Sequence, residues 1–67
     1  MEVRKLDIET KEYKPIDFND LKKNDIFIFF HDGIRYADTN TGDNVWIADG
    51  TPYLNEDGIQ EIQTVNW

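Results

Sequence analysis

The clearest pattern in the chain is the run of apolar residues within positions 25–31. In an extended conformation, side chains alternate between two faces: Ile26, Ile28 and Phe30 on one, and Phe27, Phe29 and His31 on the other. Both faces are apolar, which predicts a central strand whose second face is covered by the N-terminal segment or by a partner. Segments rich in β-branched and aromatic residues predict further strands at 34–37, 45–48, 51–54 and 59–65.

Glycines separate these segments at regular intervals. Three of the four occur in Asp-Gly pairs, and the fourth follows Thr41; the positions are Gly33, Gly42, Gly50 and Gly58. Asp-Gly suits the positive φ angles of tight hairpin turns, and spacings of eight or nine residues are typical of short strands joined by turns. The sequence therefore predicts a mainly β, antiparallel fold.

The N-terminal third is less regular. Residues 3–8 are compatible with an extended edge strand. Asp17 can cap a short helical turn over residues 18–23, and Asn24, which tolerates a left-handed conformation, would end that turn. At the other end of the chain, Ile59, Ile62 and Val65 recur every third residue, which fits neither clean alternation nor a long helix. We interpret residues 59–65 as a strand with a bulge.

Two stretches carry a resemblance to known proteins. They are Phe18-x-x-Leu21-Lys22-x-Asn24-Asp25-x-Phe27 and the pair formed by residues 46–48 and 52–59. Over residues 16–62 the chain resembles a group of small bacteriophage and prophage proteins with no assigned activity. The turn before residue 26 is similar to the entry into SH3-like barrels, with Asn24 where glycine is usual. The resemblance implies a phage origin and either a small antiparallel meander or a partly open SH3-like barrel of about five strands with one short helical turn.

Composition limits the kind of protein this can be. A chain of 67 residues has room for one core, so residues 1–67 are expected to form a single domain. There is no cysteine for a disulfide, and nine aromatic residues must supply much of the apolar burial. The absence of cysteine and of a long apolar stretch favours a cytoplasmic protein, in the host cell if it is encoded by a phage.

Charge is distributed unevenly. The net charge is −7, and residues 1–33 hold six basic and eight acidic residues. Residues 34–67 hold six acidic residues and a single basic one, Arg35. The second half therefore repels phosphate backbones and anionic lipids, so direct binding to nucleic acid or membrane is not expected. Solubility alone is the simplest explanation of such acidity.

The residue types present argue against catalysis. The chain has no serine and no cysteine, which removes the usual nucleophiles, and its one histidine, His31, is predicted beside a turn as a surface or packing residue. Its carboxylates could form an acid/base pair, but so small a core can hardly enclose the required cleft. The loop 38–44 spaces oxygen atoms but lacks the glycine and glutamate of a calcium loop. We expect no enzyme activity, metal site or cofactor.

The remaining candidate is an acidic surface with aromatic anchors. Its predicted protein-binding residues are Asp38, Asp43, Trp46, Asp49, Tyr53, Glu56 and Asp57. Such a surface could occupy a basic, nucleic-acid-binding groove of a host protein and block it, as a counter-defence factor would. The alternative for the residues is that Trp46 and Tyr53 belong to the core. The alternative for the protein is a structural or accessory subunit, part of a virion or of an oligomer formed through sheet edges, whose acidity serves only solubility.

Overall fold

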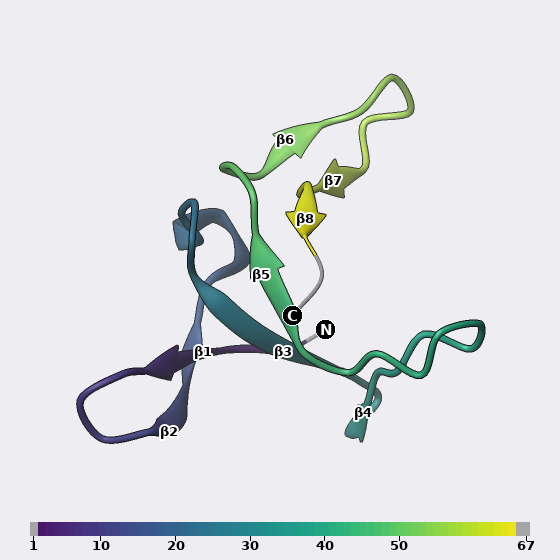
Figure 1. Cartoon of the computed structure of the whole chain (residues 1–67). Helices are drawn as coiled ribbons and strands as arrows, with labels where there is room; N and C mark the ends of the chain where they lie inside the picture. Colours follow the sequence, from purple (N-terminus) through teal and green to yellow (C-terminus); the bar gives the residue numbers. More distant parts are fainter. Residues whose placement is uncertain (1, 66–67) are drawn as a thin grey trace.

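The computed structural model describes residues 2–65 of the chain, and most of its strands lie in one antiparallel sheet (Figure 1). The sheet has the order β2-β1-β3-β5-β8, with β4 paired to β3, and a separate two-stranded sheet contains β6 and β7. The strands are β1 (Glu2–Asp7), β2 (Glu12–Ile16), β3 (Ile26–His31), β4 (Ile34–Arg35), β5 (Trp46–Ala48), β6 (Tyr53–Leu54), β7 (Gln60–Glu61) and β8 (Thr64–Val65). The predicted mainly β, antiparallel fold is confirmed.

Strand β3 is central, as its two apolar faces predict. It pairs with β1 along one side, where Val3 lies opposite Phe29. Its other side is shared, because β5 pairs with Ile26 and Phe27 whereas β4 pairs with Phe30 and His31. The chain between β4 and β5 therefore leaves the sheet and projects from it as a long loop (Figure 1).

The N-terminal segment is a strand, but its predicted place at the sheet edge is wrong. β1 lies between β3 and β2, which returns antiparallel to it, with Leu6 opposite Tyr13. Neither β2 nor β8 has a second neighbour among the described residues, so this part of the chain forms an open sheet and not a closed barrel. β1 lies beside β3 and extends the sheet sideways.

The main core cluster lies on one face of the sheet, and Ile28, at 5% exposure, is buried on the other face of β3. Phe27 and Leu21 are almost fully buried, at 2% and 1% exposure, and they pack with Val3 and Ala48. Burial of one such large side chain contributes about 1.5–3 kcal/mol. Partly buried apolar residues surround this group: Ile16, Phe18, Phe29, Trp46 and Ile62.

A short 3-10 turn, η1 (Phe18–Asp20), brings Leu21 into the core. The predicted cap is confirmed, since a carboxylate oxygen of Asp17 accepts a hydrogen bond of 2.9 Å from the amide of Asn19. The turn is shorter than the predicted 18–23, because Leu21 already has extended backbone angles. Asn24 has the predicted positive φ, 78°, and its amide donates to the carbonyl of Ala48, which joins this segment to β5.

The Asp-Gly pairs differ in what they build. Asp32 and Gly33 have φ angles of 52° and 79° and form the two-residue hairpin between β3 and β4, as predicted. Asp49-Gly50 forms no hairpin, because the strands on its two sides lie in different sheets. The amide of Asp49 instead donates to the carbonyl of Gln63, since the partner of β5 is β8.

The prediction of a single bulged strand over residues 59–65 is wrong. This segment contains β7, which pairs with β6, and β8, which pairs with β5 in the main sheet. Ile62 lies between the two strands and packs against the core. Ile62 is therefore partly buried where the chain passes from one sheet to the other. The three-residue spacing of Ile59, Ile62 and Val65 reflects two short strands and not one.

No helix within residues 2–65 has the length and apolar character needed to cross a membrane. The described molecule is elongated, with principal extents of 37 × 25 × 23 Å. Two segments stand away from the main sheet in Figure 1: the loop between β4 and β5, and the β6–β7 hairpin. These are the segments that contain most of the predicted binding residues.

Candidate functional site

The predicted binding residues do not form one surface patch. Asp38 and Asp43 lie in the loop between β4 and β5, and Trp46 begins β5. Asp49 follows the end of β5. Tyr53, Glu56 and Asp57 belong to the β6–β7 hairpin, which projects in a different direction from the loop (Figure 1). The candidate residues must therefore be considered as a loop group and a hairpin group.

Asp38 organises the loop from within. Its Oδ1 accepts hydrogen bonds of 2.8 Å from the amide of Asn40 and 3.0 Å from the amide of Thr41. These two amides hold the pKa of the Asp38 carboxyl below its ordinary value, because they stabilise the charged form. Backbone bonds from Gly42 to Asp38 and from Asp38 to Asp43 close the loop. The Asp38 carboxylate thus accepts hydrogen bonds from backbone amides of its own loop, as predicted for a polar β connection.

The two carboxylates of this loop, Asp38 and Asp43, belong to no larger acidic group within residues 2–65. Within residues 2–65, no three His, Cys, Asp or Glu side chains are grouped closely enough to hold a metal ion. Asp43 is exposed, and its backbone amide donates a hydrogen bond of 3.2 Å to the hydroxyl of Thr41. Local turn geometry therefore accounts for the alternating oxygen residues of this segment.

Trp46 belongs to an aromatic cluster beside the core. Its ring centroid lies 4.8 Å from that of Phe29, 5.6 Å from Tyr36 and 6.4 Å from Phe27. It is half-buried and lines a small apolar cleft of about 280 Å³ together with Phe18 and Ile62. Trp46 thus fits the alternative interpretation of a packing residue better than that of a free anchor.

The β6–β7 hairpin holds the other candidates, and Asn55 shapes its turn. In this hairpin Tyr53 lies opposite Glu61 and Leu54 opposite Gln60. The Oδ1 of Asn55 accepts from the amides of Asp57 (2.8 Å) and Ile59 (3.0 Å), while Gly58 has a φ of 75°. The turn predicted at Asp57-Gly58 is therefore a hairpin turn, held by Asn55 as well as by glycine.

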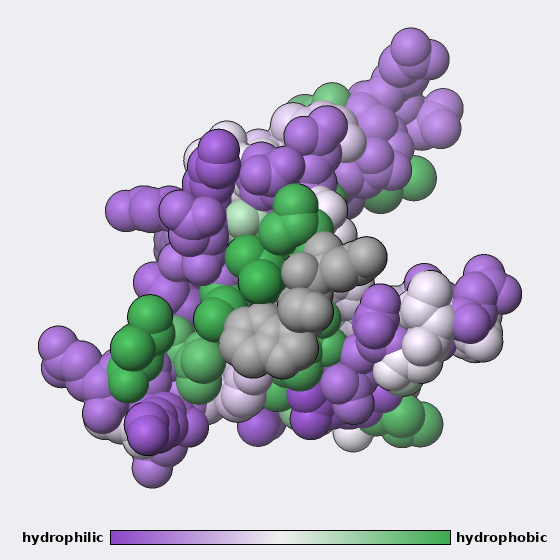
Figure 2. Space-filling view, viewed as in Figure 1, coloured by the Kyte–Doolittle hydropathy of each residue, from purple (hydrophilic) through white to green (hydrophobic). Residues whose placement is uncertain are grey.

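Apolar side chains of this hairpin are exposed, as are Ile8 after β1 and Ile34 in β4. Leu54 is 67% exposed, Ile59 61% and Tyr53 44%, and the carboxylates of Glu56 and Asp57 at the tip are exposed as well. Figure 2 shows the same pattern, with hydrophobic atoms among hydrophilic ones on the projecting arm formed by β6 and β7. Exposed apolar residues surrounded by charge are characteristic of protein-binding surfaces.

One carboxylate of the hairpin is held by neutral donors. Glu61 accepts a hydrogen bond of 3.2 Å from the hydroxyl of Tyr53 at Oε2 and one of 2.9 Å from Nδ2 of Asn55 at Oε1. The hydrogen bond to Glu61 raises the pKa of Tyr53 above its ordinary value, because the carboxylate holds the hydroxyl proton. The orientation of Glu61 is thus fixed although the residue is exposed.

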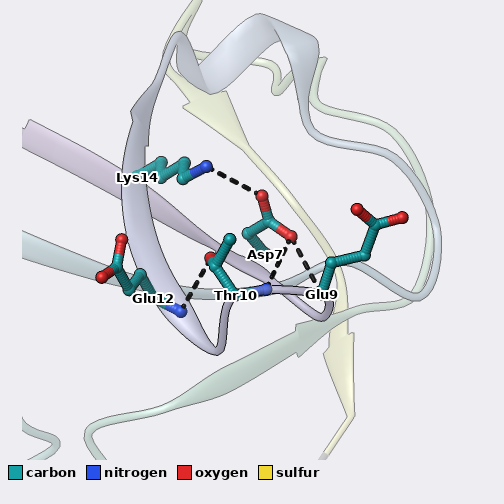
Figure 3. Close-up of polar contacts among 5 residues, drawn as sticks. All are labelled: Asp7, Glu9, Thr10, Glu12 and Lys14. Atoms are coloured by element: carbon teal, nitrogen blue, oxygen red, sulfur yellow. Dashed lines mark hydrogen bonds and ion pairs between the residues drawn. The ribbon is translucent and has the colours of Figure 1, made fainter.

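Acidic residues in the first half of the chain have a different environment. Figure 3 shows Asp7 at the β1–β2 turn, where it accepts from the amides of Glu9 and Thr10 and pairs with Lys14 at 3.0 Å. Glu2 pairs with Arg4, and Asp25 pairs with Lys5 at 3.4 Å. In contrast, no acidic residue between 34 and 65 forms an ion pair with any described residue. The charge of this half is therefore uncompensated locally.

The sequence did not single out Leu54, Ile59 or Glu61 as binding residues. The sequence pattern predicts Leu54 and Ile59 only as strand residues, and Glu61 only as one of the six acidic residues of the second half. The sequence predicts longer strands at 51–54 and 59–65, whereas β6 and β7 have two residues each and so have no face large enough to bury these side chains. Comparison adds no further guide: no protein-family model, curated protein or solved structure matches the chain.

Proposed function

We propose that this protein is a non-enzymatic protein-binding module that docks on a basic surface of another protein through the β6–β7 hairpin. The supporting observation is the exposure of Tyr53, Leu54 and Ile59 on a projecting two-stranded sheet whose tip holds Glu56 and Asp57. Apolar side chains at the centre of a contact contribute most of the binding energy, and surrounding charges select the partner and increase the association rate.

Charge complementarity identifies the chemistry of the partner. The acidic residues from 34 to 65 have no local counter-ions among the described residues, so a surface rich in lysine and arginine would supply them. Basic surfaces of this kind commonly bind nucleic-acid backbones. Together with the resemblance to phage proteins, this favours a nucleic-acid-binding protein of a bacterial host, which the hairpin would block by competition in the host cytoplasm.

The test compares two charge reversals of equal size. Glu56→Lys with Asp57→Lys changes the hairpin tip, and Glu9→Lys with Glu12→Lys makes the same change at the β1–β2 hairpin. The four side chains are exposed and take part in none of the hydrogen bonds or ion pairs found for residues 2–65. Surface changes of this kind alter stability by about 0.5 kcal/mol or less, so both variants are expected to fold.

Each variant and the natural sequence are used to capture proteins from bacterial lysate. We expect one partner with a basic surface to be retained by the natural sequence and by the 9/12 reversal but lost by the 56/57 reversal. Equal retention by both reversals would contradict the proposal, as would equal loss, because net charge and not the hairpin would then control binding. The structural-subunit alternative predicts that the 56/57 reversal retains its partner, since neither residue lies in β2 or β8, the edge strands of the main sheet.

A further inference from the structure

We infer that the Tyr53–Glu61 face of the β6–β7 hairpin is a recognition site for an arginine side chain of the partner. The inference deepens the proposed function and rests on it. It assigns two contacts to one guanidinium group: a two-bond pairing with the Glu61 carboxylate and stacking on the ring of Tyr53. Asn55 is a positioning residue in this site, because it orients Glu61 without contacting the arginine.

The carboxylate of Glu61 has the capacity for a two-bond pairing. A carboxylate offers two acceptor positions on each oxygen. Tyr53 occupies one position on Oε2, and Asn55 occupies one on Oε1. One position therefore remains on each oxygen, which matches the two parallel N–H groups of a guanidinium fork.

The two donors also reduce the conformational entropy that Glu61 loses on binding. A free glutamate side chain loses conformational freedom when it is held in one geometry, and that loss largely cancels the gain from an exposed ion pair. Here the hydroxyl of Tyr53 and the amide of Asn55 already hold the carboxylate. Both donors are neutral, so the negative charge of Glu61 remains uncompensated, unlike that of Asp7, which Lys14 neutralises.

Tyr53 supplies the second contact. It lies directly opposite Glu61 in the antiparallel pair, so both side chains are on the same face of the hairpin. The other face contains Gln60, which bonds to Asn19 of η1, so the Tyr53–Glu61 face is directed away from that contact. The tyrosine is 44% exposed. A planar guanidinium can stack on such a ring, whereas a lysine ammonium is a compact point charge that cannot use both oxygens as a fork.

The test is a titration that needs no knowledge of the partner. N-acetyl-arginine amide, N-acetyl-lysine amide and N-acetyl-citrulline amide are added to the labelled full-length protein, and NMR shifts are followed. We expect saturable shifts at Tyr53 and Glu61, with the arginine derivative binding about threefold to tenfold more tightly than the lysine derivative because of the additional charge-assisted hydrogen bond. Citrulline, which has the same shape without the charge, should produce no saturable shifts.

Three variants complete the test. Glu61→Gln should abolish the preference for arginine, and Tyr53→Leu should reduce it by removing the ring, while Glu9→Gln, with the same loss of one charge at the exposed β1–β2 turn, should leave it intact. Equal shifts with arginine and lysine, spread over Glu56 and Asp57, would overturn the arginine site. That result would leave the proposed function standing, because its own test depends on the charge reversals and not on Glu61.

Discussion

Phe27 shows how strongly a small core depends on one side chain. It is 2% exposed, and its neighbours in the sheet are Lys5 of β1 and Trp46 of β5. Phe29, two residues further along the same strand and on the same face, is only half-buried and contacts the rings of Tyr36 and Trp46. The two phenylalanines are therefore equivalent in sequence pattern but not in burial.

We predict that Phe27→Ala lowers the free energy of unfolding by about 3–5 kcal/mol, which is comparable to the whole stability of a domain of this size. Phe29→Ala should lower it by less, because its ring keeps solvent contact in the folded protein. Thermal and urea unfolding followed by circular dichroism measure both. Melting of the Phe27 variant at the parental temperature would show that the core is placed wrongly.

The Asp38 carboxylate gives a pH prediction. Its pKa lies below the ordinary 3.8 in the folded protein, because the amides of Asn40 and Thr41 bond to the charged form. A lowered folded pKa contributes stability above the unfolded pKa, and this contribution disappears as the pH falls through the folded value. In Asp38→Asn, an oxygen acceptor remains but no longer titrates, so the variant should lack this component of acid sensitivity.

NMR titration of the Asp38 carboxyl carbon tests the cause directly. We expect a midpoint below 3.8, accompanied by loss of the loop amide shifts of Asn40 and Thr41 as the carboxylate is protonated. A midpoint at or above the ordinary value would mean that Asp38 does not hold the loop.

Trp46 and Tyr53 show what residue type alone cannot decide. Each begins a short strand and stands near several acidic residues in the sequence. Trp46 is directed to the aromatic cluster because β5 pairs with the central strand β3, whereas Tyr53 is exposed because β6 pairs only with β7. Those pairings depend on contacts distant in sequence, so the acidic residues were predictable as a group but their separation into loop and hairpin was not.

At the scale of elements, turn chemistry was predictable and strand partners were less so. Asp32-Gly33 and Asp57-Gly58 lie in hairpin turns, as their sequences predict, since positive φ is a local property. Asp49-Gly50 has the same sequence but leads from one sheet to another. The choice of β8 as the partner of β5 depends on Ile62 reaching the core, which lies outside the range of any turn signal.

The stability of the β6–β7 hairpin should depend on Asn55, whereas that of the rest of the protein should not. We predict that Asn55→Ala frays the hairpin, because the amides of Asp57 and Ile59 lose their acceptor and Glu61 loses a donor. The melting temperature should change little, since none of these residues belongs to the core. Hydrogen exchange followed by NMR should show faster exchange of the hairpin amides and unchanged exchange in β3.

Asn55→Asp is the matched control for this prediction. It keeps an oxygen that can accept from Asp57 and Ile59 but removes the donor to Glu61, so the turn should persist. A hairpin that stays protected in Asn55→Ala would show that Gly58 and backbone bonds alone form the turn.

At the scale of the whole molecule, the ion pairs of the described residues are confined to one half of the chain. The ion pairs found within residues 2–65 all involve residues of the first 32 positions. The acids beyond Arg35 lie on the loop, at the end of β5 and on the hairpin, and two of these three segments project from the sheet. Solubility requires a net charge but not this segregation, which is the reason for placing the partner contact in the second half.

The most direct test of the hairpin as a docking surface is the association rate with the captured partner as a function of salt concentration. The screening length falls from about 10 Å at 0.1 M salt to about 3 Å at 1 M, and peripheral charges act mainly on association. We predict that association of the natural sequence and of the 9/12 reversal slows steeply with salt, and that the 56/57 reversal associates about tenfold or more slowly at low salt. Salt-independent association, unaffected by the 56/57 reversal, would contradict the account.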